Sequence, residues 1–158
     1  MRRLIVLLGV LTLAGCGIQP SGVVDAGEAP TGLTAGPTLY FVDGSQHLVA
    51  QPRDGGRLGT IADAIALLLS GPGSADNLHT EITAGAVTRT DVAIVPGVIE
   101  VRLPLTVGDV TELGIDQLVC TTLAVHIQSG GSRHVKVRLV FTLATPESDR
   151  LRTCSVIT

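Results

Sequence analysis

The sequence has 158 residues, of which 45% are hydrophobic and 16% charged, and its formal net charge at pH 7 is −3. Phosphate binding requires clustered lysine and arginine, so this acidic balance argues against a nucleic-acid partner. The aromatic residues are Tyr40, Phe41 and Phe141, with no tryptophan. We therefore expect no site that stacks sugars or single-stranded nucleic acid, and a core made of valine, leucine, isoleucine and alanine.

Residues 1–15 are predicted to be a lipoprotein signal peptide. Arg2 and Arg3 form a charged start, and residues 4–13 form an apolar run that is shorter than the roughly 20 residues of a membrane-spanning helix. The run ends in Leu-Ala-Gly-Cys16, which resembles the bacterial lipobox, so we expect cleavage before Cys16 and a lipid on its thiol. The alternative is an ordinary secretory signal in which Cys16 is incidental. Cleavage leaves nine basic against fourteen acidic residues, a net charge of −5.

Residues 16–37 are predicted to be the lipidated cysteine and a flexible tether. They read CGIQPSGVVDAGEAPTGLTAGP, in which glycine, proline and small residues break every helical or strand period. The expected membrane attachment is the lipid anchor, because the chain has no polybasic patch. Residues 38–158 are enough for one compact domain with its own core.

The first half of that domain is predicted to contain two strands and a helix. Residues 38–44, TLYFVDG, read as a buried strand that ends in an Asp-Gly turn, and residues 47–53, HLVAQPR, read as a second strand. Thr60 and Asp63 have the spacing of a capping box, and Gly71 and Pro72 follow as helix stop signals. The apolar residues between them recur on one helical face: Ile61, Ile65, Leu68 and Leu69.

The second half is predicted to contain a hairpin, a second helix and a last strand. Residues 86–103 read as a hairpin through Pro96-Gly97, and residues 134–141, HVKVRLVF, alternate like a strand. Asp109 or Thr111 would cap the helix between them. Its inner face is predicted to be Ile115, Leu118, Val119 and Thr122, with Leu123 beside them. The order β-β-α-β-β-α-β predicts an α+β fold, a single small sheet of mainly antiparallel strands with two helices on one face.

Two cysteines remain once Cys16 carries a lipid. They are Cys120 in the second helix and Cys154 near the C-terminus. Because thiols outside the membrane tend to be oxidised, we predict a Cys120–Cys154 disulfide that fastens the C-terminal tail. The alternative is that Cys120 is a small buried residue and Cys154 a free thiol.

No metal site, cofactor or enzyme activity is expected. Ser70 is close in sequence to Asp76 and His79, but it ends a helix and does not occupy a strand-to-helix elbow, so it is expected to bond the last-turn carbonyls. The histidines have neither i,i+4 partners nor a Cys-x-x-Cys setting; they are His47, His79, His126 and His134.

Three carboxylates are predicted to share one helical face near its start. Asp109, Glu112 and Asp116 have this spacing, and capping and compensation of the helix dipole explain them. The alternatives are a cation site or a dock for a basic partner.

With these elements placed, the chain resembles the GerMN domain, a sporulation and germination module of envelope lipoproteins in Gram-positive bacteria. Three stretches carry the likeness over about residues 38–141. The first is LYFVDG with HLVAQPR, ending in Arg53; the second is IADAIALLLSGP; the third is VIEVRLP with LGIDQLVCTTLAV, which contains Gln117. Family members often follow the last strand with Val-Asp-Gly, whereas this chain continues as VFTLATPESD. The resemblance implies a fold similar to ring-building motifs and a role as a protein-interaction unit.

We therefore expect a non-catalytic interaction module on the extracellular face of the cytoplasmic membrane, held there by its lipid. Its partner would be an envelope protein or a second copy of the chain. The predicted docking surface is the exposed face or edge of the sheet, with Glu100, Arg102, Lys136 and Arg138. The alternative is a lipoprotein that binds a small ligand for transport or envelope sensing, although a domain this size has little room for a pocket.

Overall fold

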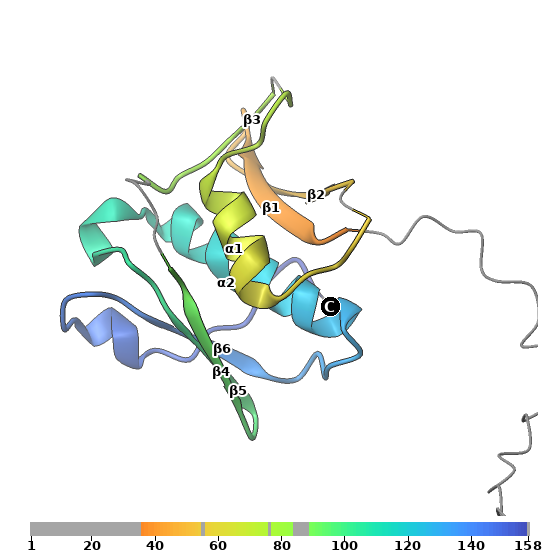
Figure 1. Ribbon diagram of the computed structural model, residues 1–158. Coiled ribbons are helices and arrows are strands. Elements are labelled where there is room, and N and C mark those ends of the chain that lie inside the picture. Colours follow the sequence, from red (N-terminus) through yellow and green to blue (C-terminus); the bar gives the residue numbers. More distant parts are fainter. Residues whose placement is uncertain (1–35, 55, 76, 84–88, 158) are drawn as a thin grey trace, which may run out of the picture. The chain divides into compact units, whose positions relative to one another are not determined.

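The computed structural model describes residues 36–54, 56–75, 77–83 and 89–157. Cys16, the predicted signal peptide and all but the last two residues of the predicted tether lie outside these ranges. The described elements are six strands, two α-helices and two short 3-10 helices (Figure 1). Neither of the described α-helices combines the length and the apolarity that a membrane crossing requires.

The first sheet has β1 (Thr38–Asp43) at its centre. It pairs antiparallel with β2 (Leu48–Pro52) on one side and with β3 (Leu78–His79) on the other. As predicted, β1 is buried on both faces, from Leu39 to Val42. β3 was not predicted, because two residues are too few to show an alternating pattern.

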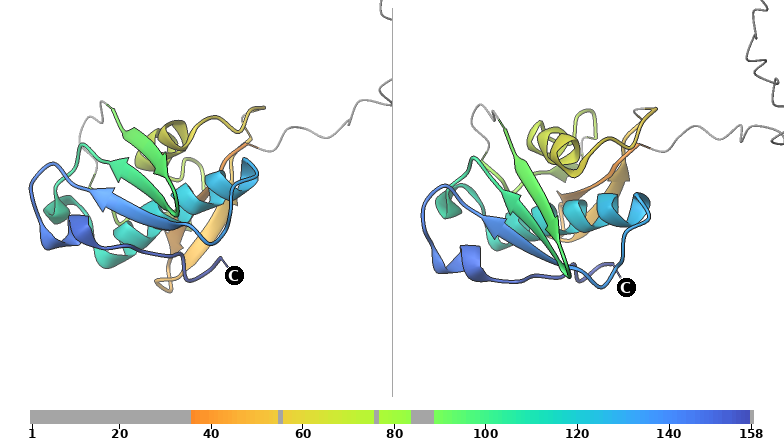
Figure 2. Two further views of the ribbon diagram at one scale, coloured as in Figure 1. Left: turned by 90° about the horizontal axis from the view of Figure 1, so that it is seen from below. Right: turned by 60° about the horizontal axis from the view of Figure 1, so that its bottom comes forward.

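The second sheet has the order β4-β5-β6. β4 (Asp91–Val95) and β5 (Val98–Arg102) form the predicted hairpin through Pro96-Gly97, where Gly97 has a φ of 78° that favours glycine. β6 (Lys136–Val140) runs parallel to β5, since α2 (Glu112–Gln128) forms the crossover between them. Figure 2 shows α2 lying across one face of this sheet.

The predicted α+β class, with two helices and mainly antiparallel pairing, is confirmed, with one difference. The strands divide between two three-stranded sheets and do not form a single one. The reason is that β2 and β3 occupy the two edges of β1, so the β4–β5 hairpin pairs with β6 instead. An alternating sequence marks a segment as a strand but does not specify which edge it will join.

The helices join the two sheets into one core. α2 touches β1 of the first sheet and β6 of the second, and α1 (Ile61–Leu69) packs on α2 and β1. This position explains why α2 is buried almost all round, from Gly114 to Val125, with only Asp116 partly exposed. The predicted inner-face residues of both helices are buried.

The predicted ends of α1 are confirmed. Thr60 and Asp63 form the capping box: the Asp63 amide donates to the Thr60 hydroxyl at 3.1 Å, and the Thr60 amide donates to the Asp63 carboxylate at 2.8 Å. The Ser70 hydroxyl donates to the Leu67 carbonyl at 2.6 Å, and Gly71 follows with a φ of 89°.

The chain enters the first sheet beside the last residue of α2. The Thr38 amide donates to Oε1 of Gln128 at 3.0 Å, and Nε2 of Gln128 donates to the Gly36 carbonyl at 3.4 Å. One side chain thus holds the backbone on both sides of Pro37, immediately before β1 begins.

Candidate interaction surface

The face of the second sheet that points away from α2 carries the predicted docking residues. We call it the outer face; its side chains are those of Asp91, Ala93, Val95, Val98, Glu100, Arg102, Lys136, Arg138 and Val140. They alternate along the strands with buried inner-face residues such as Ile99, Val101, Val137 and Leu139. Sequence alternation therefore placed the four charged residues on one face, and the structure brings them together there.

Glu100 is the centre of an ion cluster on this face. Its carboxylate lies 2.6 Å from Nη2 of Arg102 and 3.5 Å from Nη1 of Arg138, which is opposite Glu100 in the parallel ladder. The Arg102 side chain is 66% exposed, and Nε of Arg138 is buried without a hydrogen-bond partner in the described structure. Lys136 is exposed and forms no ion pair with another described residue. Two arginines thus bind one carboxylate, and Lys136 is a third cation on the same face.

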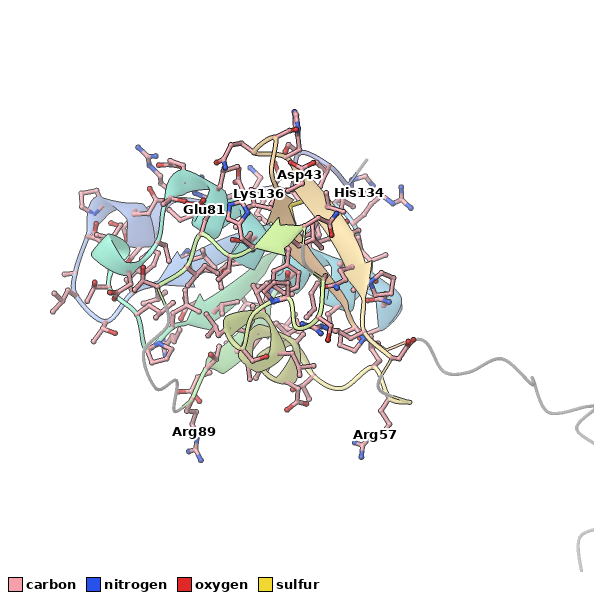
Figure 3. All side chains as sticks on the ribbon, turned by 90° about the horizontal axis from the view of Figure 1, so that it is seen from above. Asp43, Arg57, Glu81, Arg89, His134 and Lys136 are labelled. Carbon is pink, nitrogen blue, oxygen red and sulfur yellow. A yellow bond between two sulfur atoms is a disulfide. The ribbon has the colours of Figure 1, made fainter. Side chains whose placement is uncertain are left out.

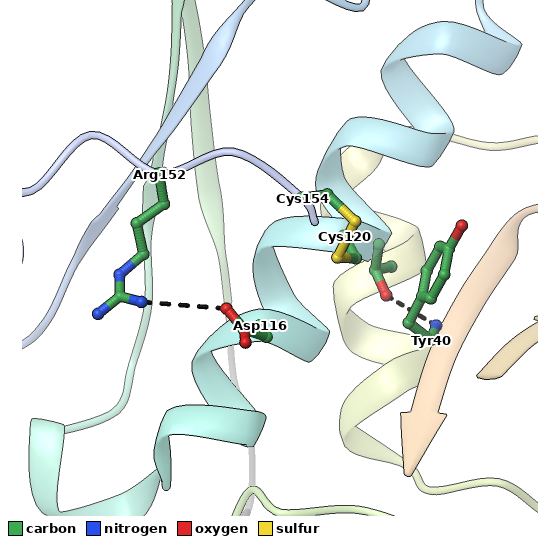
Figure 4. The surroundings of a disulfide bond; sticks show 6 residues. Tyr40, Asp116, Cys120, Arg152 and Cys154 are labelled. Carbon is green, nitrogen blue, oxygen red and sulfur yellow. Dashed lines mark hydrogen bonds and ion pairs between the residues drawn. A yellow bond between two sulfur atoms is a disulfide. The ribbon is translucent and has the colours of Figure 1, made fainter. Parts of the chain in front are cut away.

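The predicted disulfide is present. Cys120 on α2 and Cys154 in the C-terminal tail are bonded, with their Cα atoms 4.9 Å apart (Figure 4). Both residues are buried, at 1% and 5% exposure. The bond therefore lies inside the core and fastens the tail to the central helix.

The tail also covers the outer edge of β6. The Arg152 amide donates to the Val137 carbonyl at 2.8 Å, and the Val137 amide donates to the Arg152 carbonyl at 2.9 Å. Through these two bonds Arg152 pairs with Val137 of β6 as an isolated antiparallel bridge. They leave the β6 edge partly protected from pairing with other chains.

The Arg152 side chain ties the same tail to α2. It lies 2.6 Å from a carboxylate oxygen of Glu147 and 3.2 Å from one of Glu112. It also forms an ion pair with Asp116 at 3.9 Å, which is drawn in Figure 4. Partial burial opposes the charge of Arg152, yet the hydrogen bonds and attraction of Glu147 and Glu112 raise its pKa. Burial raises the pKa of Asp116, against the attraction of Arg152.

The three carboxylates that sequence spacing grouped together do not act together. Asp109 ends the short helix Val107–Asp109, where it accepts hydrogen bonds from the Thr106 amide and hydroxyl, and Thr111 caps α2. Glu112 and Asp116 face Arg152 of the tail. Sequence spacing grouped Asp109 with the other two carboxylates because it did not show that α2 begins only after Asp109. No residue close in sequence identified Arg152 as the partner of Glu112 and Asp116.

Arg53 fixes the loop after α1. Its guanidinium donates to the Gly71 carbonyl and lies over the Phe41 ring, 5.7 Å from the centroid. On one side of it is a cavity of about 550 Å³ that Arg57, Leu58, Asp63 and Leu67 also line. The Arg57 side chain points away from the domain (Figure 3). Arg53 therefore has a packing role, and the cavity beside it is open.

The groups considered for catalysis are engaged in local contacts. His79 lies 3.1 Å from Glu81, and His47 lies 3.8 Å from Asp43; Ser70 is bonded to its own helix. Asp76 lies outside the described residues. Among the residues that are described, no cluster of three histidine, cysteine or acidic side chains is arranged to hold a metal ion.

Comparison with known proteins gives a limited structural similarity. The chain is similar to the solved tandem GerMN domains of the sporulation protein GerM from Bacillus subtilis, with 17% sequence identity and a TM-score of 0.49. The match covers 82% of this chain and 50% of that one, so the chain spans half the length of the matched protein. No model of a protein family matches the chain, and no curated protein matches it. At this identity and superposition, the likeness carries no inference about partners or activity.

Proposed function

We propose that the protein is a lipid-anchored, non-catalytic interaction module on the extracellular face of the cytoplasmic membrane. The observation that carries the proposal is the outer face, where a fixed ion cluster of Glu100, Arg102 and Arg138 is presented to solvent together with Lys136. A surface of aligned, partly immobilised cations suits an acidic partner surface, because complementary charges guide encounter and orientation.

Two further features support an extracytoplasmic location. The sequence around Cys16 has the order of charged start, apolar run, small residues and cysteine that lipoprotein export requires. The Cys120–Cys154 bond is of a kind that persists in oxidising compartments. Both features favour a site of action outside the cytoplasm.

In-cell crosslinking of the full-length protein, read by mass spectrometry, tests the proposal. We expect recurrent crosslinks from the outer face to one envelope protein, lost in Cys16→Ala and in the double variant Arg102→Glu with Arg138→Glu. Arg57→Glu is the matched control, because it reverses an exposed charge on another part of the surface (Figure 3). Circular dichroism of each variant verifies its fold. The absence of any specific crosslink would refute the proposal, and crosslinks between copies alone would identify self-association.

A second candidate function is the binding of a small ligand. It is favoured by the open cavity of about 550 Å³ beside Arg53, which has both charged and apolar lining. A saturable rise of the melting temperature with one envelope metabolite, removed by Leu67→Asp in the cavity wall, would favour this candidate.

A further inference from the structure

The two edges of the second sheet differ. The β6 edge is bridged by Arg152 of the disulfide-fastened tail. The other edge is β4, which pairs with β5 and with no other strand in the described structure. An uncovered edge strand presents unpaired backbone groups that another chain can join.

The backbone of Val92 and Ile94 points to this free edge. On β5, the Leu103 amide donates to Val140 and the Gly97 carbonyl accepts from Lys136, so the odd-numbered residues of β5 face β6. Its even-numbered residues therefore face β4, where their register partners are Asp91, Ala93 and Val95. Because bonding direction alternates along a strand, the N–H and C=O groups of Val92 and Ile94 face outward.

The side chain of Ile94 is on the inner face of the sheet but is not covered. Its register partner Ile99 is fully buried, whereas Ile94 is 60% exposed. Val92, on the same side, is only partly buried. The helices thus cover the inner face of β5 and leave that of β4 partly open.

A groove lies along this uncovered strip. It has a volume of about 510 Å³ and runs between β4 and the start of α1, with Ile61 and Ala62 on the helix side and His126 at the end of α2. Thr90, which is 9% exposed, also lines it, and its hydroxyl has no hydrogen-bond partner in the described structure. Both views in Figure 2 show α1 beside β4. The groove therefore has an apolar wall, and beside it are the Thr90 hydroxyl and the outward-facing backbone groups of Val92 and Ile94.

We propose that β4 binds one extended segment of a partner polypeptide as a fourth strand of this sheet. The segment would place apolar side chains in the groove against Val92 and Ile94, and a basic side chain on the outer face beside Asp91. Asp91 is exposed and forms no ion pair with a described residue, because Arg102 opposite it is bound to Glu100. This proposal rests on the proposed function and adds a second contact for the same partner: a basic extended segment at the β4 edge, beside the acidic surface that meets Arg102 and Arg138.

A second copy of the chain fits this edge less well. If two β4 strands paired along their whole length, each would offer Asp91, Ala93 and Val95 on the outer face. None of these is basic, so the Asp91 carboxylates would stay without counter-ions. A partner strand that carries lysine or arginine removes that deficit.

A fluorescein-labelled peptide that alternates valine and lysine over seven residues, with blocked ends, is the probe for the purified domain with its tether. We expect saturable binding by anisotropy, with amide shifts in NMR spectra concentrated at Val92 and Ile94. Ile94→Ser should weaken binding at least tenfold. Leu143→Ser is the matched control, because Leu143 is 64% exposed in a loop. A peptide that alternates valine and glutamate should bind at least threefold more weakly than the lysine peptide.

Backbone pairing has its own test. Methylation of the amides at one alternating set of peptide positions should abolish binding, and methylation of the other set should leave it unchanged, because only one set faces β4. Equal effects of both sets, or equal binding by Ile94→Ser and wild type, would overturn the proposal. So would a concentration-dependent dimer of the free protein that Ile94→Ser abolishes.

Failure here is distinguishable from failure of the proposed function. If crosslinks from the outer face to an envelope protein persist unchanged in Ile94→Ser cells, the interaction module stands and the β4 site is wrong. If no specific crosslink forms in wild-type cells, the proposed function is wrong whatever the peptide does.

Discussion

The amide of Tyr40, in the middle of the central strand, donates to the hydroxyl of Thr121 on α2 at 3.0 Å. The Tyr40 carbonyl accepts from Nε2 of Gln117 at 3.0 Å, and Oε1 of Gln117 accepts from the Glu81 amide at 2.8 Å. β3 is too short to reach this point of β1. Two helix side chains therefore satisfy backbone groups that a longer neighbouring strand would have paired.

Thr121→Val is expected to lower the free energy of unfolding by about 1–3 kcal/mol, because it leaves the buried Tyr40 amide without an acceptor. Thr122→Val is the matched control. The Thr122 hydroxyl is buried and has no partner in the described structure, so its removal should be neutral or stabilising. Urea denaturation measures both changes. Equal losses in the two variants would show that the Tyr40 bond has no special role.

Reduction of the Cys120–Cys154 disulfide is expected to cost about 3–4 kcal/mol, from the chain entropy of a 34-residue separation. Urea unfolding with and without a reductant measures the difference, and the variant Cys120→Ala with Cys154→Ala should no longer respond to the reductant. The β6 edge should then exchange its amide hydrogens faster, because the tail that covers it is released. An unchanged midpoint under reducing conditions would contradict this account.

Acid is expected to weaken the start of α1. The backbone and side-chain hydrogen bonds from Thr60 lower the pKa of Asp63 below its ordinary value of 3.8. A carboxyl whose pKa is lower in the folded state contributes stability above its unfolded pKa and loses it as pH falls through the folded value. Asp63→Asn should therefore flatten the fall in stability below about pH 4.

Asp116 should behave in the opposite way. Burial raises its pKa, so its ionisation opposes folding and that part of the stability declines as pH rises through the folded value. Asp116→Asn should make the stability less sensitive to pH between the unfolded pKa of Asp116 and its higher folded value. NMR titration of the two carboxyl groups measures both pKa values, and shifts in the same direction would disprove the assignment.

Gly114→Ala is expected to destabilise the domain by about 1–3 kcal/mol through overpacking, although alanine favours a helix by about 1 kcal/mol. A Cβ at Gly114 would lie 2.3 Å from the Glu81 carbonyl oxygen, which is backbone. Gly108→Ala is the control, since the nearest atom to its Cβ would be 3.6 Å away. Thermal unfolding distinguishes the two, and equal melting temperatures would show that the segment at Glu81 moves aside.

Local patterns predicted the local structure well. The capping box of Thr60 and Asp63, the Pro96-Gly97 hairpin and the alternation of β6 each depend on residues close in sequence. The four charged residues of the outer face were predicted for the same reason, because alternation decides which side chains share a face. The Cys120–Cys154 bond was predicted from the expected oxidising compartment and from the two cysteines that remain besides Cys16. The distance between the two residues was not needed.

Contacts between distant segments could not be predicted in this way. Nothing near Arg152 indicates that its partners are Glu112 and Asp116, 36 or more residues earlier in the chain. Ile94 lies on the same side of its sheet as the core residue Ile99 but is 60% exposed, because an alternating pattern identifies a face but not how far the helices extend over it. The division into two sheets depends on which strands pair with each other. That pairing is determined by packing contacts throughout the domain and not by the sequence of any one strand.

The two bonds of Gln128 lie where a pull on the amino end of the domain would first act. Under the proposed lipid anchor, tension would enter the domain at Gly36 and Thr38, the residues that Gln128 binds. The load next reaches β1, whose ladder with β2 spans Thr38 to Val42. Force along a strand loads such a ladder in shear, so its hydrogen bonds resist together. Under that proposal we expect the bonds of Gln128 at the end of α2 to break first and the β1–β2 ladder to break second.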